Sequence, residues 1–157
     1  TLTRFVFSNS LMRVALHAKE VRPERYQIVL AWPDKSEPDP FDSEYASAYN
    51  FGATKGGHVS YHSGPLKALR FMDSAVYTNM HHSTLLQLAD LMVGATREFI
   101  ECAISKKDDA FGRNLTRLIA RRFLGYTDDI FGRGISVASG DTEFKAKIRQ
   151  YIKQELE

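Results

Sequence analysis

The stretch "HHSTLLQLADLMVGATREFIE", residues 81–101, decides the expected fold. Its apolar residues recur every three or four positions, which predicts a helix over residues 84–105. At 100° per residue, one broad side of this helix is apolar and a narrow polar stripe interrupts it. We therefore expect the apolar side, with Leu88 near its centre, to be buried. The apolar side holds Leu85, Leu88, Leu91, Met92, Ala95, Phe99 and Cys102, and the polar stripe holds Gln87, Asp90, Gly94, Arg97 and Glu101.

The polar stripe has two interpretations. In the first, it is the face that the helix turns to solvent, where Thr84 and Gln87 form a capping box and the helix dipole favours Asp90. In the second, Asp90 points at the carboxyl ends of neighbouring strands, where α/β sheets form their sites. Gly94, one turn further on, would then let a substrate approach the helix closely. The pattern alone leaves both interpretations open.

The remaining elements predict an α/β fold, because strand-like and helix-like segments alternate along the chain. The run "RYQIVLAW", residues 25–32, is almost continuously apolar, which predicts a strand buried on both faces. Further strands are expected at residues 3–7 and 66–73, and further helices at residues 11–18, 41–49, 114–123 and 141–156.

Composition limits the class of protein. The chain has 157 residues, of which 43% are hydrophobic and 25% charged, so we expect one globular domain. Its α/β part would span residues 1–107 and a helical extension residues 108–157. A net charge of +2 does not by itself indicate a nucleic-acid partner. The single cysteine, Cys102, allows no internal disulfide and favours a cytoplasmic setting. No apolar run reaches the roughly 18 residues of a membrane span, so no membrane partner is expected.

Three carboxylates are candidates for a metal site. Asp34 follows the strand predicted at residues 25–32, and Asp73 ends the strand predicted at residues 66–73. Asp90 would meet them if it faces the carboxyl ends of these strands. Converging carboxylates repel each other unless a cation lies between them. Mg²⁺ or Mn²⁺ is the usual cation for such oxygen ligands.

The segment "FMDSAVYTNMHHSTLLQLADLMVGATREF", residues 71–99, resembles the C-terminal signature of the DUF3800 family. In that family a strand ending in "DS" precedes a helix that opens "LQLADLxxGAxR". The resemblance implies an RNase H-like fold with an acidic site across its sheet. It also implies an N-terminal strand with a "DESG"-type motif, which this sequence lacks. The matching positions are Asp73, Ser74, Gln87, Ala89, Asp90, Gly94 and Arg97.

The missing motif leads to two expectations about the sheet and its site. The first strands and one acid would lie upstream of Thr1, or a partner chain in a homo-oligomer would complete the sheet. Alternatively, the protein has lost the activity.

Two functions are therefore expected. The first is a metal-dependent, nuclease-like enzyme in which two metal ions activate a water molecule. Asp90 and Asp34 would be metal ligands, and Asp73 would be a third ligand or a supporting acid. Gln87 and Arg97 would bind or orient the substrate. The alternative is a non-catalytic module that keeps the fold and binds nucleic acid or a protein.

Three arginines bear on the choice between these functions. Arg113, Arg117 and Arg121 are spaced four apart, so a helix would place them on one face. This face is either solvated or a phosphate-contacting stripe, which would fit a nucleic-acid substrate.

Overall fold

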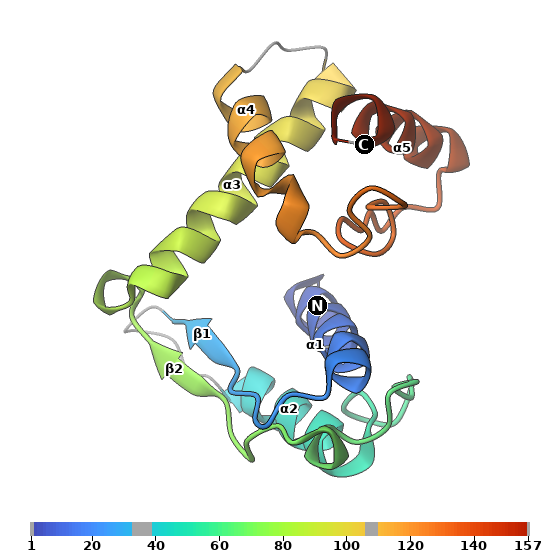
Figure 1. The fold of residues 1–157 in the computed structure, drawn as a ribbon. Helices are drawn as coiled ribbons and strands as arrows, with labels where there is room; N and C mark the ends of the chain where they lie inside the picture. Colours follow the sequence, from blue (N-terminus) through green and yellow to red (C-terminus); the bar gives the residue numbers. More distant parts are fainter. Residues whose placement is uncertain (1, 33–38, 106–109, 157) are drawn as a thin grey trace. The chain divides into compact units, whose positions relative to one another are not determined.

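The computed structural model describes residues 2–32, 39–105 and 110–156. The chain forms two compact units, Thr1–Leu86 and Gln87–Glu157 (Figure 1). The boundary expected after residue 107 therefore falls inside the second unit. No helix within the described ranges is long and apolar enough to cross a membrane.

The first unit begins with helix α1, Leu2–Val21. The strand expected at residues 3–7 is wrong, because these residues form the first turns of α1. The apolar residues Phe7, Leu11, Ala15 and Ala18 recur at helical spacing and are all buried, so one face of α1 enters the core. The helix expected at residues 11–18 is confirmed.

Helix α2, Asp39–Phe51, packs beside α1 and confirms the helix expected at residues 41–49. The two helices share a core in which the Ser8 hydroxyl donates a hydrogen bond of 2.6 Å to the buried Glu44 carboxylate. The apolar residues of this core include Phe7, Leu11, Ala15, Ala18, Tyr45, Ala48, Tyr61, Leu66 and Phe71.

The sheet consists of two parallel strands, β1 (Val29–Ala31) and β2 (Val76–Thr78), with Val29 opposite Val76 (Figure 1). A single bridge between Tyr26 and Phe71 precedes this pair. The strand predicted at residues 66–73 is wrong over most of its length. Residues 66–69 form the 3₁₀ helix η1 (Leu66–Leu69), and the strand proper starts after Asp73.

Only one face of this sheet is covered by described residues. Leu30 packs against the core of the first unit, whereas Val29 and Val76 are 41% and 44% exposed. Within the first unit β1 is therefore covered on one face, and its burial on both faces stays a prediction. A parallel sheet and flanking helices give the α/β character that the sequence predicts. The finer assignment, an RNase H-like sheet, stays a prediction.

Helix α3, Thr84–Ser105, has the expected bounds and follows the short 3₁₀ helix η2, Met80–His82. Ser83 caps α3 by accepting a hydrogen bond from the Leu86 amide at 3.3 Å, so the capping box predicted for Thr84 and Gln87 is not the cap seen.

Burial along α3 follows the predicted wheel only in its C-terminal half. Ala95, Phe99 and Cys102 are buried there. Leu85 and Leu88, near the start of the helix, are 79% and 50% exposed. Within the second unit Leu88 is therefore half exposed, and its expected burial stays a prediction.

The second unit packs α4 (Ala110–Ile119), the 3₁₀ helix η3 (Ala120–Arg122) and α5 (Thr142–Leu156) around the C-terminal half of α3 (Figure 1). Helix α5 confirms the helix expected at residues 141–156, and Asp141 caps it by accepting a hydrogen bond of 3.0 Å from the Phe144 amide. Helix α4 starts four residues earlier than the predicted helix at 114–123. The buried core of the second unit comprises Phe99, Ala103, Ala120, Ile130, Ile135, Ile148, Ile152 and Leu156.

Candidate functional site

Asp73 does not lie at the carboxyl end of a strand. It occupies an irregular segment between the Tyr26–Phe71 bridge and the start of β2, where its exposed side chain accepts a hydrogen bond of 3.3 Å from the Ser74 hydroxyl. Since parallel strands form their sites at the carboxyl ends, the expected position of Asp73 at that edge is wrong.

The other two carboxylates do not complete a site in the described residues. Asp90 is exposed on α3 and belongs to the second unit, whereas Asp73 belongs to the first. Asp34 lies outside the described residues. Within residues 2–32, 39–105 and 110–156, no group of three or more His, Cys, Asp or Glu side chains could hold a metal ion. A Mg²⁺ or Mn²⁺ site therefore stays a prediction that depends on Asp34.

The polar stripe of α3 is exposed along its length, as the first interpretation of the stripe expects. Gln87, Asp90 and Arg97 are all exposed, and the Arg97 guanidinium pairs with Glu101 at 2.8 Å. No described atom lies within 4 Å of a Cβ built on Gly94, so nothing described approaches the helix there. The expected roles of these residues in substrate binding stay predictions.

One of the three stripe arginines is engaged by α5, because Arg117 forms an ion pair with Glu155. Arg113 lies on α4 and is half-buried. Arg121 lies in η3 and is exposed. To contact phosphates, Arg117 would have to give up this partner, and the phosphate-contacting stripe stays a prediction.

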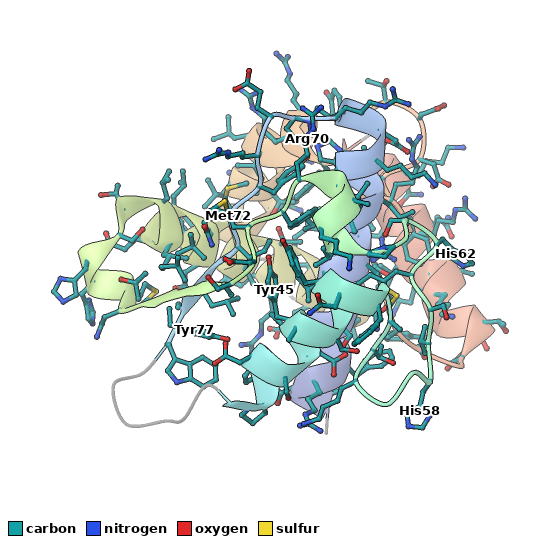
Figure 2. All side chains as sticks on the ribbon, turned by 90° about the horizontal axis from the view of Figure 1, so that it is seen from below. Tyr45, His58, His62, Arg70, Met72 and Tyr77 are labelled. Atoms are coloured by element: carbon teal, nitrogen blue, oxygen red, sulfur yellow. The ribbon has the colours of Figure 1, made fainter. Side chains whose placement is uncertain are left out.

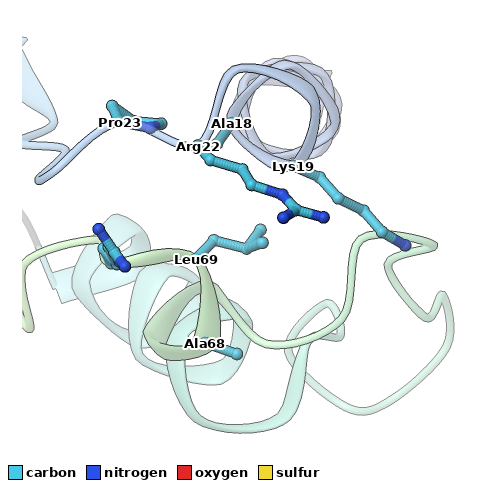
Figure 3. A pocket seen from close by; sticks show the side chains of 7 residues that line it. Ala18, Lys19, Arg22, Pro23, Ala68 and Leu69 are labelled. Carbon is cyan, nitrogen blue, oxygen red and sulfur yellow. The ribbon is translucent and has the colours of Figure 1, made fainter.

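A second cationic surface is a cavity of about 300 Å³ in the first unit (Figure 3). Three cationic side chains line it, Lys19 and Arg22 from the end of α1 and Arg70 from the end of η1. No acidic residue lines it among those described, and its walls are apolar. We call this cavity the basic pocket; its wall residues are Ala18, Pro23, Ala68 and Leu69.

The backbone of the basic pocket is unusual at both arginines. Arg22 and Arg70 have φ angles of 50° and 65°, in the left-handed region that glycine or asparagine usually fills at a helix end. The Arg22 amide donates to the Ala18 carbonyl at 2.9 Å, and the Arg70 amide donates to the carbonyls of Leu66 and Lys67. A side chain in this region costs about 1–2 kcal/mol. Both helix ends therefore carry an arginine in spite of a backbone cost.

The position of the basic pocket follows from the sheet. The Tyr26 amide donates to the Arg70 carbonyl at 3.1 Å, and Phe71, the next residue, bridges to Tyr26. Arg22 and Arg70 thus lie where the chain leaves a helix and enters the pair of parallel strands. The basic pocket lies at the amino end of the pair, opposite the edge where the sequence predicts an acidic site.

Sequence reasoning missed the basic pocket, because its arginines lie far apart in the chain. A weak signal was present in "VRPE", residues 21–24, where a proline follows an arginine at the end of an apolar helix pattern. Nothing in the sequence links this segment to Arg70.

A buried polar cluster lies elsewhere in the first unit. The Glu44 carboxylate also accepts a hydrogen bond of 3.2 Å from the Lys55 amide. Burial and the negative charge of Glu44 raise the pKa of Tyr61, whose buried hydroxyl has no hydrogen-bond partner among the described residues. The cluster is closed to solvent and joins α1 to α2, so its role is structural.

A second polar link holds α2 to the strand pair. The Tyr45 hydroxyl donates a hydrogen bond of 2.7 Å to the Met72 carbonyl, and both residues are labelled in Figure 2. Burial, and then the negative charges of Tyr49 and Asp73, raise the pKa of Tyr45 to about 12. The Tyr77 hydroxyl similarly donates to Asp42 at 2.6 Å.

Comparison with known proteins adds no assignment to these sites: no protein-family model, no curated protein and no solved structure matches the chain.

Proposed function

We propose that the first unit binds the phosphate backbone of a nucleic acid through the basic pocket. The observation that carries this proposal is that Lys19, Arg22 and Arg70 line one cavity without a described acid. Contacts from lysine and arginine to phosphate supply most of the sequence-independent affinity of nucleic-acid-binding proteins. This is the non-catalytic binding function that the sequence offers as an alternative.

Binding is tested by fluorescence anisotropy with labelled single- and double-stranded oligonucleotides across a salt series. Log K should fall linearly with log salt, because bound phosphates release counterions. Arg22→Asn should weaken binding and reduce the slope by about 0.7–0.9 for each phosphate contact removed. Arg25→Asn is the matched control, since Arg25 is exposed in the same segment but does not line the basic pocket.

Two results would overturn the proposal. The first is no binding to either kind of oligonucleotide at low salt. The second is a salt slope for Arg22→Asn equal to that of wild type and of the Arg25→Asn control.

Metal-dependent cleavage is a second candidate, and one observation favours it. β1 and β2 run parallel, and α/β sheets form their sites at the carboxyl ends of such strands. In the sequence, Asp34 follows the carboxyl end of β1. Asp34 and Asp90 would bind Mg²⁺ or Mn²⁺, and the metal would activate a water molecule for attack on a phosphodiester.

Cleavage is tested by incubating an oligonucleotide with the protein and Mn²⁺. Asp34→Asn and Asp90→Asn should each abolish cleavage. Asp73→Asn should spare it, because Asp73 precedes β2 instead of following it. Cleavage that survives Asp34→Asn, or that needs no metal, would exclude this mechanism.

A further inference from the structure

We infer that the basic pocket recognises a phosphate monoester, as found at the end of a nucleic-acid strand or on a free nucleotide, in preference to a phosphodiester inside a strand. This inference rests on the proposed function, since it names the part of the polyanion that the basic pocket takes. Three observations carry it: the charge of the basic pocket, its shape and the backbone that holds its arginines.

The charge of the basic pocket matches a dianion better than a monoanion. Its lining carries three positive side chains and no described acid. A phosphate monoester carries close to two negative charges at pH 7, whereas an internal phosphodiester carries one. Arginine binds phosphate oxygens through two parallel N–H groups, so Arg22 and Arg70 together can satisfy more oxygens than a diester leaves free.

Lys19 adds a third donor group to the basic pocket. Its ammonium donates to the His62 carbonyl at 3.5 Å, outside the lining of the basic pocket, and keeps further N–H groups on the same nitrogen. The acids Glu20 and Glu24, which lie nearby in the sequence, do not line the cavity.

The shape of the basic pocket fits the end of a nucleic-acid strand better than the interior of one. A volume of about 300 Å³ lies at the lower limit for small-molecule sites, and it suits a phosphate with its sugar. Figure 3 shows the Arg22 guanidinium extending into the space between the end of α1 and η1, above Leu69. The Arg22 guanidinium thus lies within the small cavity, and Lys19 and Arg70 belong to its lining. The apolar wall, which includes Pro23 and Leu69, offers a sugar or base a surface to pack on.

The backbone indicates that both guanidinium groups have a purpose beyond ending a helix. Arg22 and Arg70 adopt the left-handed conformation, which asparagine and glycine adopt with less strain. The favourable contact of a cation with a helix C-terminus needs no left-handed backbone at the arginine itself. Strain of this kind gathers at ligand sites, and two of the three non-glycine residues with positive φ in the described part of the chain line the basic pocket.

The experiment compares one short single-stranded oligonucleotide in three forms, with a 5′-phosphate, with a 3′-phosphate and with hydroxyls at both ends. Wild-type protein should bind one phosphorylated form at least about tenfold more tightly than the hydroxyl form. Arg22→Asn and Arg70→Asn should each remove this preference, while the melting temperature stays equal or rises because asparagine suits the left-handed backbone. Arg25→Asn should keep the preference.

The source of the monoester is separated by competition. A nucleoside monophosphate that displaces the phosphorylated oligonucleotide at a similar Kd assigns the basic pocket to free nucleotides. Failure to displace it assigns the basic pocket to strand ends.

The outcomes separate this inference from the proposed function. Equal affinity for all three forms of the oligonucleotide would overturn the monoester inference and leave backbone binding intact. Loss of the preference in the Arg25→Asn control would also overturn it, because the effect would then be one of net charge. Absence of binding to every form at low salt would overturn the proposed function as well.

Discussion

Replacing glycine by alanine should raise the stability at Gly94 of α3 and lower it at Gly112 of α4. Glycine inside a helix is less stable than alanine by about 0.5–1 kcal/mol. A Cβ on Gly94 of α3 would meet no described atom within 4 Å, so Gly94→Ala should gain this full amount. A Cβ on Gly112 of α4 would stand 2.6 Å from Glu98 Cβ and 2.8 Å from Glu98 Oε2. Helix α4 would therefore have to move away from α3.

The expected cost at Gly112 follows from this clash. Forcing an extra carbon into a packed contact costs about 1–3 kcal/mol. Subtracting the gain in helix propensity leaves Gly112→Ala destabilised by up to about 2 kcal/mol. Urea unfolding followed by circular dichroism measures both variants, with equal m-values as the check that the unfolded states match. A gain in stability in Gly112→Ala as large as that in Gly94→Ala, or reduced stability in Gly94→Ala, would refute the packing described for α3 and α4.

Two further predictions concern the cores. Phe99→Ala should lower the free energy of unfolding by about 3–5 kcal/mol, because Phe99 is fully buried. Leu88→Ala should lower it clearly less, because Leu88 is half exposed. Equal losses in the two variants on urea unfolding would contradict this ranking. Tyr45 should make the first unit sensitive to alkali. Its pKa is raised from 10 to about 12 in the folded state. The folding stability that its neutral hydroxyl contributes is therefore complete below pH 10 and is lost as the pH rises from 10 to 12. The stability gap between wild type and Tyr45→Phe, measured at pH 8 and pH 11, should therefore shrink at pH 11, and a constant gap would show that Tyr45 does not titrate as described.

The long helix and the last helix could be predicted from the sequence because their signals are local. Helix α3 carries its periodicity over six turns, and Asp141 is a strong cap directly before α5. The segment at residues 66–73 could not be predicted in the same way. A short apolar run suits a strand or a helical turn equally, and the left-handed Arg70, which ends η1, decides between them.

The candidate site was less predictable than the fold. The carboxylates were chosen because they follow apolar runs. This reasoning fails for Asp73, because β2 starts after Asp73. The basic pocket depends on the parallel pairing that brings the segments after Arg22 and Arg70 together. Such a contact between distant segments leaves no periodic or local mark in the sequence.

The parallel pairing of β1 and β2 also sets an order of events during refolding. Pairing Val29 with Val76 closes the long segment that contains α2 and η1, so the entropy of closing this loop opposes the pairing. The helices of the second unit are local structures that can form before any long-range contact, but packing α5 on α3 brings Phe99 to Tyr151 and closes a loop of similar length. Trp32, the single tryptophan, hydrogen-bonds the Thr78 carbonyl through its amide and packs against Tyr77. Its fluorescence therefore reports the late closing of the sheet, separately from the early gain of helix.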